Sequence, residues 1–252
     1  MQCDDVYQFC ILLAGMYFEI HTEFAQVRSF FEDYITSPAS LQPVPMVISG
    51  SQEARKAEIE NNEASDDNLE PLFPDYYYEE LSILRAIAEI APIQSALLMH
   101  GSALAMDGKG YIFTAPSGTG KSTHSRFWRI KFGNRVEMVN DDKPFLRFCE
   151  DDIYVCGSPW DGKHHLSKNI NVPLRAILFL ERGTQNQIER VPGQSMISRL
   201  YAQIYEPIAR DSKIATLHLL SLLCERVPFY RLRCRPDVEA AMIAYRGLRE
   251  EM

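Results

Sequence analysis

The stretch GYIFTAPSGTGKSTHSRFWR, residues 110–129, combines an apolar strand, a loop of small residues and a helix. Residues 111–113 are bulky and favour a strand. In Ser117-Gly118-Thr119-Gly120 little side-chain bulk remains, so consecutive backbone N–H groups can turn toward one point. Lys121 then adds a positive charge and Ser122 a hydroxyl suited to Mg²⁺, at the positive end of the helix dipole. The stretch therefore predicts a phosphate-binding P-loop.

The P-loop consensus G-x-x-x-x-G-K-[ST] is met except at its first glycine, where Ala115 stands. A methyl group is a small departure there if the turn has a negative φ. The alternative is a glycine-rich turn that binds nothing, but strand, loop and helix all agree with the motif. The predicted nucleotide-binding residues are Ser117, Gly118, Thr119, Gly120, Lys121, Ser122 and Thr123.

Length and composition indicate a globular chain that can bury a core. It has 252 residues, 46% of them hydrophobic, enough for one large domain or two small ones. The longest apolar runs, such as AILFL at 176–180, are far short of the roughly 20 residues that a membrane helix needs. The six cysteines form no C-x-x-C pair and suit a reducing compartment. We therefore expect a cytoplasmic protein without a membrane partner.

The negative charge is concentrated in one stretch. Residues 51–80 hold ten acidic and two basic side chains, a difference equal to the net charge of −8 of the whole chain. The remainder is neutral and has no basic face, which argues against nucleic acid as a partner. The acidic, Asn-rich sequence EIENNEASDDNLE, residues 58–70, predicts a solvated linker, with a docking site as the alternative. We expect an N-terminal α+β module over 1–50, an acidic linker over 51–74 and a P-loop domain over 75–252.

Hydrophobic periodicity predicts the elements of both domains. Two strands turn at Gly15, a helix covers 25–36 and a strand follows at 46–50. A core helix over 76–91 stops before Pro92. Between residues 94 and 182 strands that look antiparallel outnumber helices, so the predicted fold class is α/β with a mixed sheet.

Two segments, HGSALAMDGKGYIFTAPSGTGKST (100–123) and VNDDKPFLRF (139–148), resemble the nucleotide-binding core shared by HPr serine kinase and ATP-dependent phosphoenolpyruvate carboxykinase. The recognisable motifs cover roughly residues 95–182. Uncharacterised bacterial HPr-kinase-like proteins are more similar still, because they also carry PW-x-GK, here 159–163, and VP-x-Y-x-L, here 227–232. Some kinases of ribosomally made peptides are similar in this core. The resemblance implies an ATP- and Mg²⁺-dependent kinase.

The resemblance also implies roles for three residues. Asp141 and Asp142, at the end of a predicted strand, match the metal-binding aspartates and would share Mg²⁺ with Ser122. The alternative is a turn capped by Asn140 and Asp141. His100 matches a histidine that lies near the phosphates, although a lone histidine is more often structural.

The segment SPWDGKHH, residues 158–165, gathers many functional groups in one loop. Lys163 could clamp a phosphate or a substrate carboxylate, and Asp161 or His164 could take a hydroxyl proton. The alternative is a surface turn anchored by a buried Trp160.

One departure from the family bears on the reaction. HPr kinases place an aspartate, resembling a general base, immediately before the Ser/Thr-Gly of the loop, where Pro116 stands here. Asp142, Asp161 and His100 are then the candidate bases. By resemblance the acceptor is a serine of a peptide or small protein; the alternative is an inactive nucleotide-sensing or peptide-binding accessory protein. HPr kinases assemble as rings, so the resemblance would imply a homo-oligomer. The sequence itself shows no interface pattern for one.

Overall fold

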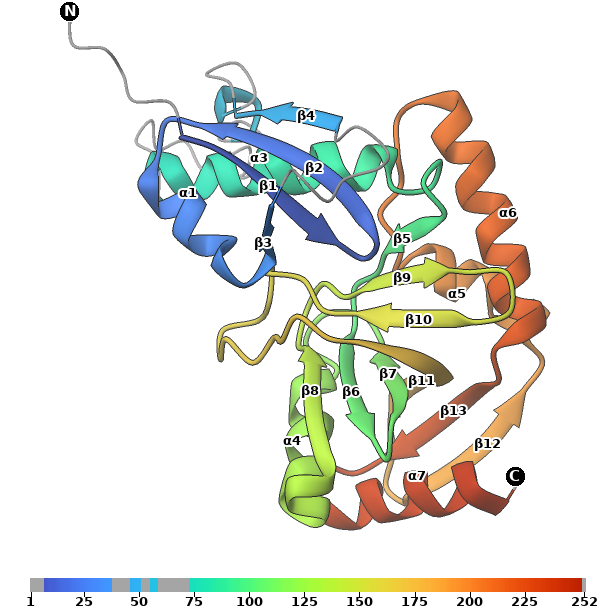
Figure 1. Ribbon diagram of the computed structural model, residues 1–252. Coiled ribbons are helices and arrows are strands. Elements are labelled where there is room, and N and C mark those ends of the chain that lie inside the picture. Colours follow the sequence, from blue (N-terminus) through green and yellow to red (C-terminus); the bar gives the residue numbers. More distant parts are fainter. Residues whose placement is uncertain (1–6, 38–45, 51–54, 59–72, 251–252) are drawn as a thin grey trace, which may run out of the picture. The chain divides into compact units, whose positions relative to one another are not determined.

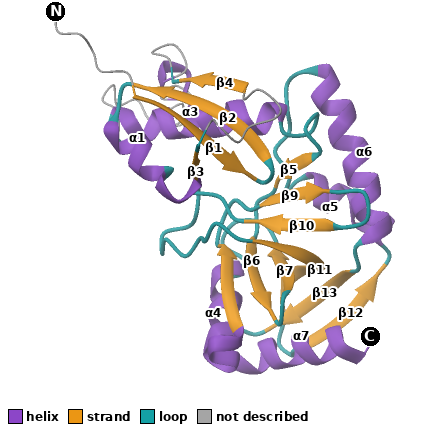
Figure 2. Ribbon diagram, in the orientation of Figure 1, coloured by secondary structure: helices purple, strands orange, loops and turns teal. Residues whose placement is uncertain are grey.

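The computed structural model describes residues 7–37, 46–50, 55–58 and 73–250. The chain divides into two compact units, Met1–Ile90 and Ala91–Met252. Both units contain helices and strands (Figures 1 and 2). Most of the acidic linker predicted over 51–74 lies outside the described residues.

The first unit is built on a four-stranded sheet with the order β3-β1-β2-β4. Strands β1 and β2 form an antiparallel hairpin that turns at Ala14 and Gly15, both with positive φ (48° and 73°). A two-residue turn with two positive φ angles matches the twist of the strands that it joins. The predicted pair of strands turning at Gly15 is confirmed. The bounds are β1 Tyr7–Leu13, β2 Met16–Thr22, β3 Ile35–Thr36 and β4 Met46–Ser49.

The helix predicted over 25–36 is shorter in the structure. Helix α1 covers Ala25–Phe30, and a 3-10 turn follows at Glu32–Tyr34. The prediction is wrong beyond these elements because Ile35 pairs with Ile11 and so joins the sheet as β3. Tertiary pairing outweighs the helical pattern at this point.

Helix α3 (Asp75–Ile90) completes the first unit. It buries Tyr78, Ile83 and Ile87 and packs against α1 and β4. The sequence pattern assigned this helix to the P-loop domain, whereas the division of the structure falls after Ile90.

The second unit contains a nine-stranded mixed sheet. Strands β7, β11 and β13 run parallel to one another, and the other pairings are antiparallel. The predicted mixed α/β sheet is thereby confirmed. The bounds are β5 Ala96–Leu98, β6 Ser102–Met106, β7 Lys109–Thr114, β8 Val136–Asn140, β9 Phe145–Phe148, β10 Ile153–Cys156, β11 Asn171–Arg182, β12 Gln187–Val191 and β13 Phe229–Cys234.

Helices cover both faces of this sheet. Successive strand residues point to opposite faces, and accordingly Ile112 belongs to one hydrophobic cluster and Phe113 to another. The first cluster includes side chains of α5 (Ile197–Tyr201) and α6 (Arg210–Arg226). The second includes Trp128 of α4 (Lys121–Phe132) and side chains of α7 (Val238–Glu250).

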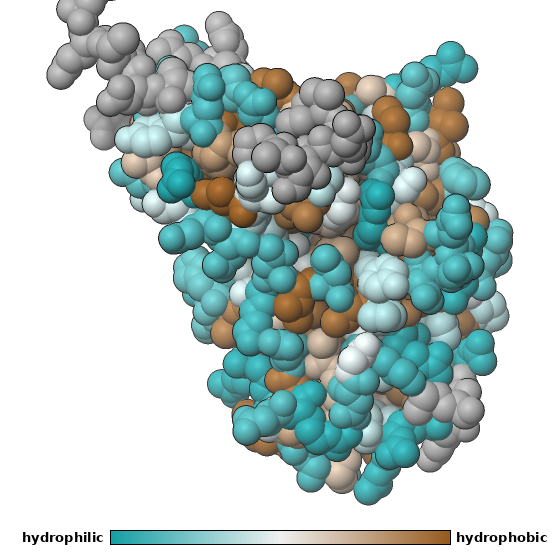
Figure 3. All heavy atoms as spheres, in the orientation of Figure 1, coloured by the Kyte–Doolittle hydropathy of each residue, from teal (hydrophilic) through white to brown (hydrophobic). Residues whose placement is uncertain are grey.

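Hydrophobic residues are mostly inside. In the described part of the chain no helix has the length and apolar character needed to cross a bilayer. The face drawn in Figure 3 is largely hydrophilic, with hydrophobic residues in small groups.

Candidate functional site

Strand direction brings the predicted motifs to one edge of the second sheet. Strands β7 and β11 are parallel, and β8 runs in the same direction because both β7 and β8 pair antiparallel with β6. The P-loop follows β7, Asp141 follows β8, and Arg182 ends β11. Ligands of α/β proteins bind beyond the carboxyl ends of their strands, so this edge is the candidate site.

The loop has the backbone that an anion site requires. Gly118 and Gly120 have φ of 73° and 117°, which a residue with a side chain rarely adopts. The N–H and the hydroxyl of Thr119 both donate to the carbonyl of Pro116, at 3.3 and 2.8 Å, and close a turn. Within the described residues the amides of Gly118 and of residues 120–122 have no hydrogen-bond partner. These free donors at a helix start can bind a phosphate.

Lys121 lies at the base of the loop and is 8% exposed. Its Nζ donates to the carbonyl of Ala115 at 3.0 Å. Burial lowers the pKa of Lys121, and Asp142 and Asp141 raise it. The net effect is a lowered pKa, and Lys121 lines the same cavity as the two aspartates. Ser122 at the start of α4 is exposed.

Asn140 organises the turn that carries the two aspartates. It is fully buried, and its Oδ1 accepts the amides of Asp142 at 2.8 Å and Lys143 at 2.6 Å. The capped turn considered as an alternative therefore exists, with Asn140 as the cap. It coexists with a site, because Asp141 and Asp142 both line a cavity beside the P-loop.

Asp141 is held by a buried hydroxyl pair that the sequence analysis missed. Ser102 Oγ donates to Asp141 Oδ1 at 2.6 Å and lies 2.5 Å from Ser125 Oγ of α4. Ser102 and Ser125 are at most 1% exposed, and Asp141 is 5% exposed. A serine at the first position of a buried strand, two residues after His100, was the only signal for this role.

His100 faces the second aspartate. Its Nε2 lies 3.5 Å from Asp142 Oδ1, and the amide of Gly101 donates to the Asp142 carbonyl at 3.0 Å. A Cβ on Gly101 would lie 3.0 Å from Ile112 Cγ2 and 3.2 Å from the carbonyl of Phe113. The backbone at this position therefore lies so close to β7 that a glycine fits best. Burial lowers the pKa of His100, and Lys121 lowers it further.

The loop over residues 158–165 is anchored by a buried Trp160, as expected for the alternative that it is a surface turn. Trp160 is 5% exposed, and Asn140 Nδ2 donates to the carbonyls of Ser158 at 3.0 Å and Trp160 at 3.3 Å. Asp161 turns into its own loop, where its carboxylate accepts the amide of Ser167 at 3.1 Å and lies 3.1 Å from His165 Nδ1.

A cavity of about 470 Å³ brings most of the predicted residues together. Asp161 and Thr119 do not line it; Thr119 lines two neighbouring hollows instead. The polar and charged residues around this cavity come from the segments next to strands β6, β7 and β8, from the first turn of α4 and from the loop over 158–165. They are His100, Ser117, Lys121, Ser122, Thr123, Asp141, Asp142, Lys163 and His164.

The oxygen donors of this cavity suit a magnesium ion shared with a phosphate. Mg²⁺ prefers oxygen ligands and is usually held by one or two carboxylates together with substrate phosphates and water. Ser122, Asp141 and Asp142 offer such a set. Among the described residues no group of three or more His, Cys, Asp or Glu side chains is arranged to hold a metal on its own.

Comparison with known proteins yields a distant likeness. No family model matches the chain, and no curated protein matches its sequence. Among solved structures, the HPr(Ser) kinase/phosphatase from Coxiella burnetii is similar with a TM-score of 0.34 and 12% sequence identity. The match covers 62% of this chain and 99% of that chain.

Proposed function

We propose that the chain binds ATP with Mg²⁺ at residues 117–123 and transfers the γ-phosphoryl group to a hydroxyl acceptor. The observation that carries the proposal is the meeting, in one cavity, of unpaired loop amides, Lys121 and two aspartates. Phosphoryl transfer needs positioning and charge neutralisation more than covalent chemistry. This cavity offers donors for the phosphates and carboxylates for the cation.

Each group of residues in the cavity has a role that follows from its chemistry. The loop backbone would wrap the phosphates, Lys121 would contact the β- and γ-phosphates, and Ser122 with Asp141 or Asp142 would hold Mg²⁺. The bound cation would neutralise charge on the phosphates. By resemblance, the acceptor is a serine of a peptide or small protein.

The acceptor proton needs a base within reach. The transfer breaks the bond between the γ-phosphorus and the ADP oxygen, and forms a bond from that phosphorus to the acceptor oxygen. The hydroxyl proton passes to a side chain or to water. His100, Asp142 and His164 line the cavity, whereas Pro116 has no basic atom and Asp161 is turned into its own loop. We therefore propose His100, Asp142 or His164 as the base.

Pro116 and Asp161 also favour a second function. Without a carboxylate at Pro116 and with Asp161 engaged at Ser167, the chain could bind nucleotide as an accessory protein that does not turn it over. ATP turnover distinguishes the two functions.

Calorimetry with Mg-ATP on the wild type and on Lys121→Met tests the nucleotide site. A charge-assisted contact is worth about 1.5–3 kcal/mol, so the variant should bind at least about tenfold more weakly. Lys131→Met is the matched control, because Lys131 is an exposed lysine in the last turn of the same helix. Equal affinity in all three proteins would refute the assignment of the loop. Binding without ADP formation, when serine peptides are present, would favour the accessory protein.

A further inference from the structure

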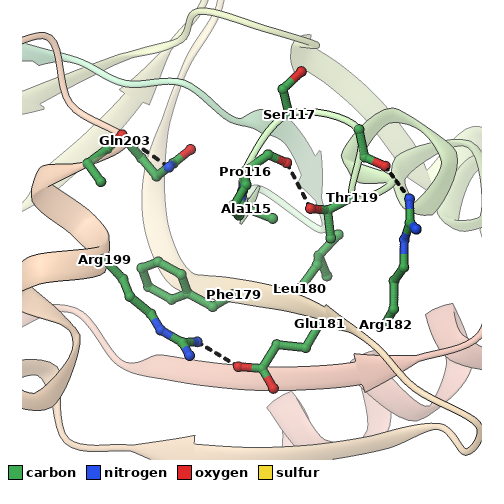
Figure 4. A pocket seen from close by; sticks show the side chains of 12 residues that line it. Ala115, Pro116, Ser117, Thr119, Phe179, Leu180, Glu181, Arg182, Arg199 and Gln203 are labelled. Carbon is green, nitrogen blue, oxygen red and sulfur yellow. Dashed lines mark hydrogen bonds and ion pairs between the residues drawn. The ribbon is translucent and has the colours of Figure 1, made fainter.

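Arg182 ties the end of β11 to the P-loop. Its Nη2 donates to the carbonyl of Gly118 at 2.7 Å (Figure 4). Gly118 is one of the two loop glycines with positive φ, and its amide is among the unpaired donors. The guanidinium is therefore held against the part of the loop that would surround a phosphate.

Most of the binding capacity of Arg182 is unused. A guanidinium carries five N–H donors in a planar fork, and only the bond to Gly118 is found within the described part of the chain. Glu181 beside it is engaged elsewhere: it accepts from Arg199 at 2.6 Å and from Arg233 at 3.2 Å. No ion pair joins Arg182 to any described carboxylate. Its charge is thus available to a ligand.

Arg182 also stands between two hollows that flank the loop. One, of about 820 Å³, is lined by the first half of the loop together with Phe179, Arg199 and Gln203 (Figure 4). The other, of about 450 Å³, is lined by the second half of the loop and by Phe127. Arg182 and Gly118 line both hollows. Arg182 does not line the cavity that contains Lys121 and the two aspartates, but Gly118, to which it is bonded, does.

We propose that Arg182 is a further nucleotide-binding residue, which holds Gly118 in the free protein and directs its remaining donors to a phosphate of the bound nucleotide. This role rests on the proposed function. Arginine suits it because its planar fork binds phosphate oxygens while one N–H stays on the carbonyl. The sequence motif contains no such arginine, because Arg182 lies 64 residues beyond Gly118 in the chain.

The alternative role is a structural clamp on the loop, and two substitutions separate the two roles. Arg182→Gln keeps an N–H donor for Gly118 but removes the charge, whereas Arg182→Lys keeps the charge without the fork. Arg182→Met removes both. Arg246→Met is the control, because Arg246 is an exposed arginine of α7 that lines none of the cavities described.

Calorimetry with Mg-ATP on these proteins tests the proposal. We expect Arg182→Met and Arg182→Gln to bind about tenfold more weakly than the wild type, Arg182→Lys to retain a substantial part of the affinity, and Arg246→Met to be unchanged. Wild-type affinity in Arg182→Gln, or an affinity of Arg182→Lys no better than that of Arg182→Met, would overturn the phosphate contact. Lack of binding by the wild type would refute the proposed function itself, and this role with it.

Discussion

Replacing Ser102 with alanine should destabilise the second unit by removing a hydrogen bond to a buried carboxylate. Ser102 lies 2.6 Å from Asp141 Oδ1 and 2.5 Å from Ser125 Oγ. An ionised carboxylate only accepts hydrogen bonds, so the single hydroxyl proton of Ser102 goes to Asp141. Ser125 must then donate to Ser102. The substitution therefore removes one charge-assisted bond and one bond between neutral hydroxyls.

The magnitude follows from what each partner can do afterwards. Hydrogen bonds to charged groups contribute about 1.5–3 kcal/mol, and neutral ones about 0.5–1.5 kcal/mol. Ser125 can turn to the carbonyl of Lys121, 3.3 Å away, and so recover its own bond. Asp141, 5% exposed, has no such replacement on its Oδ1 within the described residues. We expect a loss of about 2 kcal/mol, which lowers the midpoint of thermal unfolding by about 4–8 °C.

Tryptophan fluorescence measures this loss in the second unit alone. The chain has two tryptophans, Trp128 and Trp160, and both are buried there. Ser125→Ala is the matched control, because it removes only the neutral bond and should cost less than half as much. Equal losses in the two variants, or no loss in Ser102→Ala, would refute the assignment of the proton to Asp141. Ser102→Ala should also weaken Mg-ATP binding, since it frees the carboxylate that would hold the cation.

Two further predictions concern stability. A Cβ on Gly157 would lie 1.8 Å from the backbone carbonyl of Lys168, so Gly157→Ala should displace the loop over 158–165 and cost several kcal/mol in urea unfolding followed by tryptophan fluorescence; a loss below about 1 kcal/mol would contradict this packing. Burial, and then Glu79, raise the pKa of Glu80 from 4.5 to about 7. The folded state then holds a proton that the unfolded state loses, so this contribution is full below pH 4.5 and is lost as the pH rises through 7. Glu80→Gln keeps the neutral form and should stabilise the first unit by up to about 3 kcal/mol at pH 8 but little at pH 4, as measured by circular dichroism in urea; the same effect at both pH values would argue against a buried proton.

The strand, loop and helix of residues 110–129 could be predicted from the sequence because their signals are local. Strand, loop and helix follow one another within residues 110–129, and the glycines report on backbone conformation directly. The structure has β7, positive φ at both loop glycines and α4 starting at Lys121. The mixed sheet was also predictable, since strand patterns outnumber helical ones before residue 182.

The residues that complete the site were not predictable, because they act across strands distant in sequence. Ser102 reaches Asp141 only once β6 lies between β7 and β8, and Arg182 reaches Gly118 only once β11 pairs with β7. Asp161 shows the converse. The many functional groups in its loop suggested a catalytic role. In the structure the Asp161 carboxylate instead accepts a hydrogen bond from the amide of Ser167 in the same loop.

The site depends on strand register as much as on residue type. Side chains alternate between the two faces of a strand, so a shift of one residue reverses the face of every side chain. Ser102 lies opposite Phe113, and Ala103 lies opposite both Ile112 and Asn140. With β6 displaced by one residue, the hydroxyl of Ser102 would leave Asp141 and an alanine would face the carboxylate instead. The apolar residues of β6 pack on both faces of the sheet, and they therefore also keep Ser102 beside Asp141, the proposed cation ligand. In this way the hydrophobic core is coupled to the candidate site at its edge.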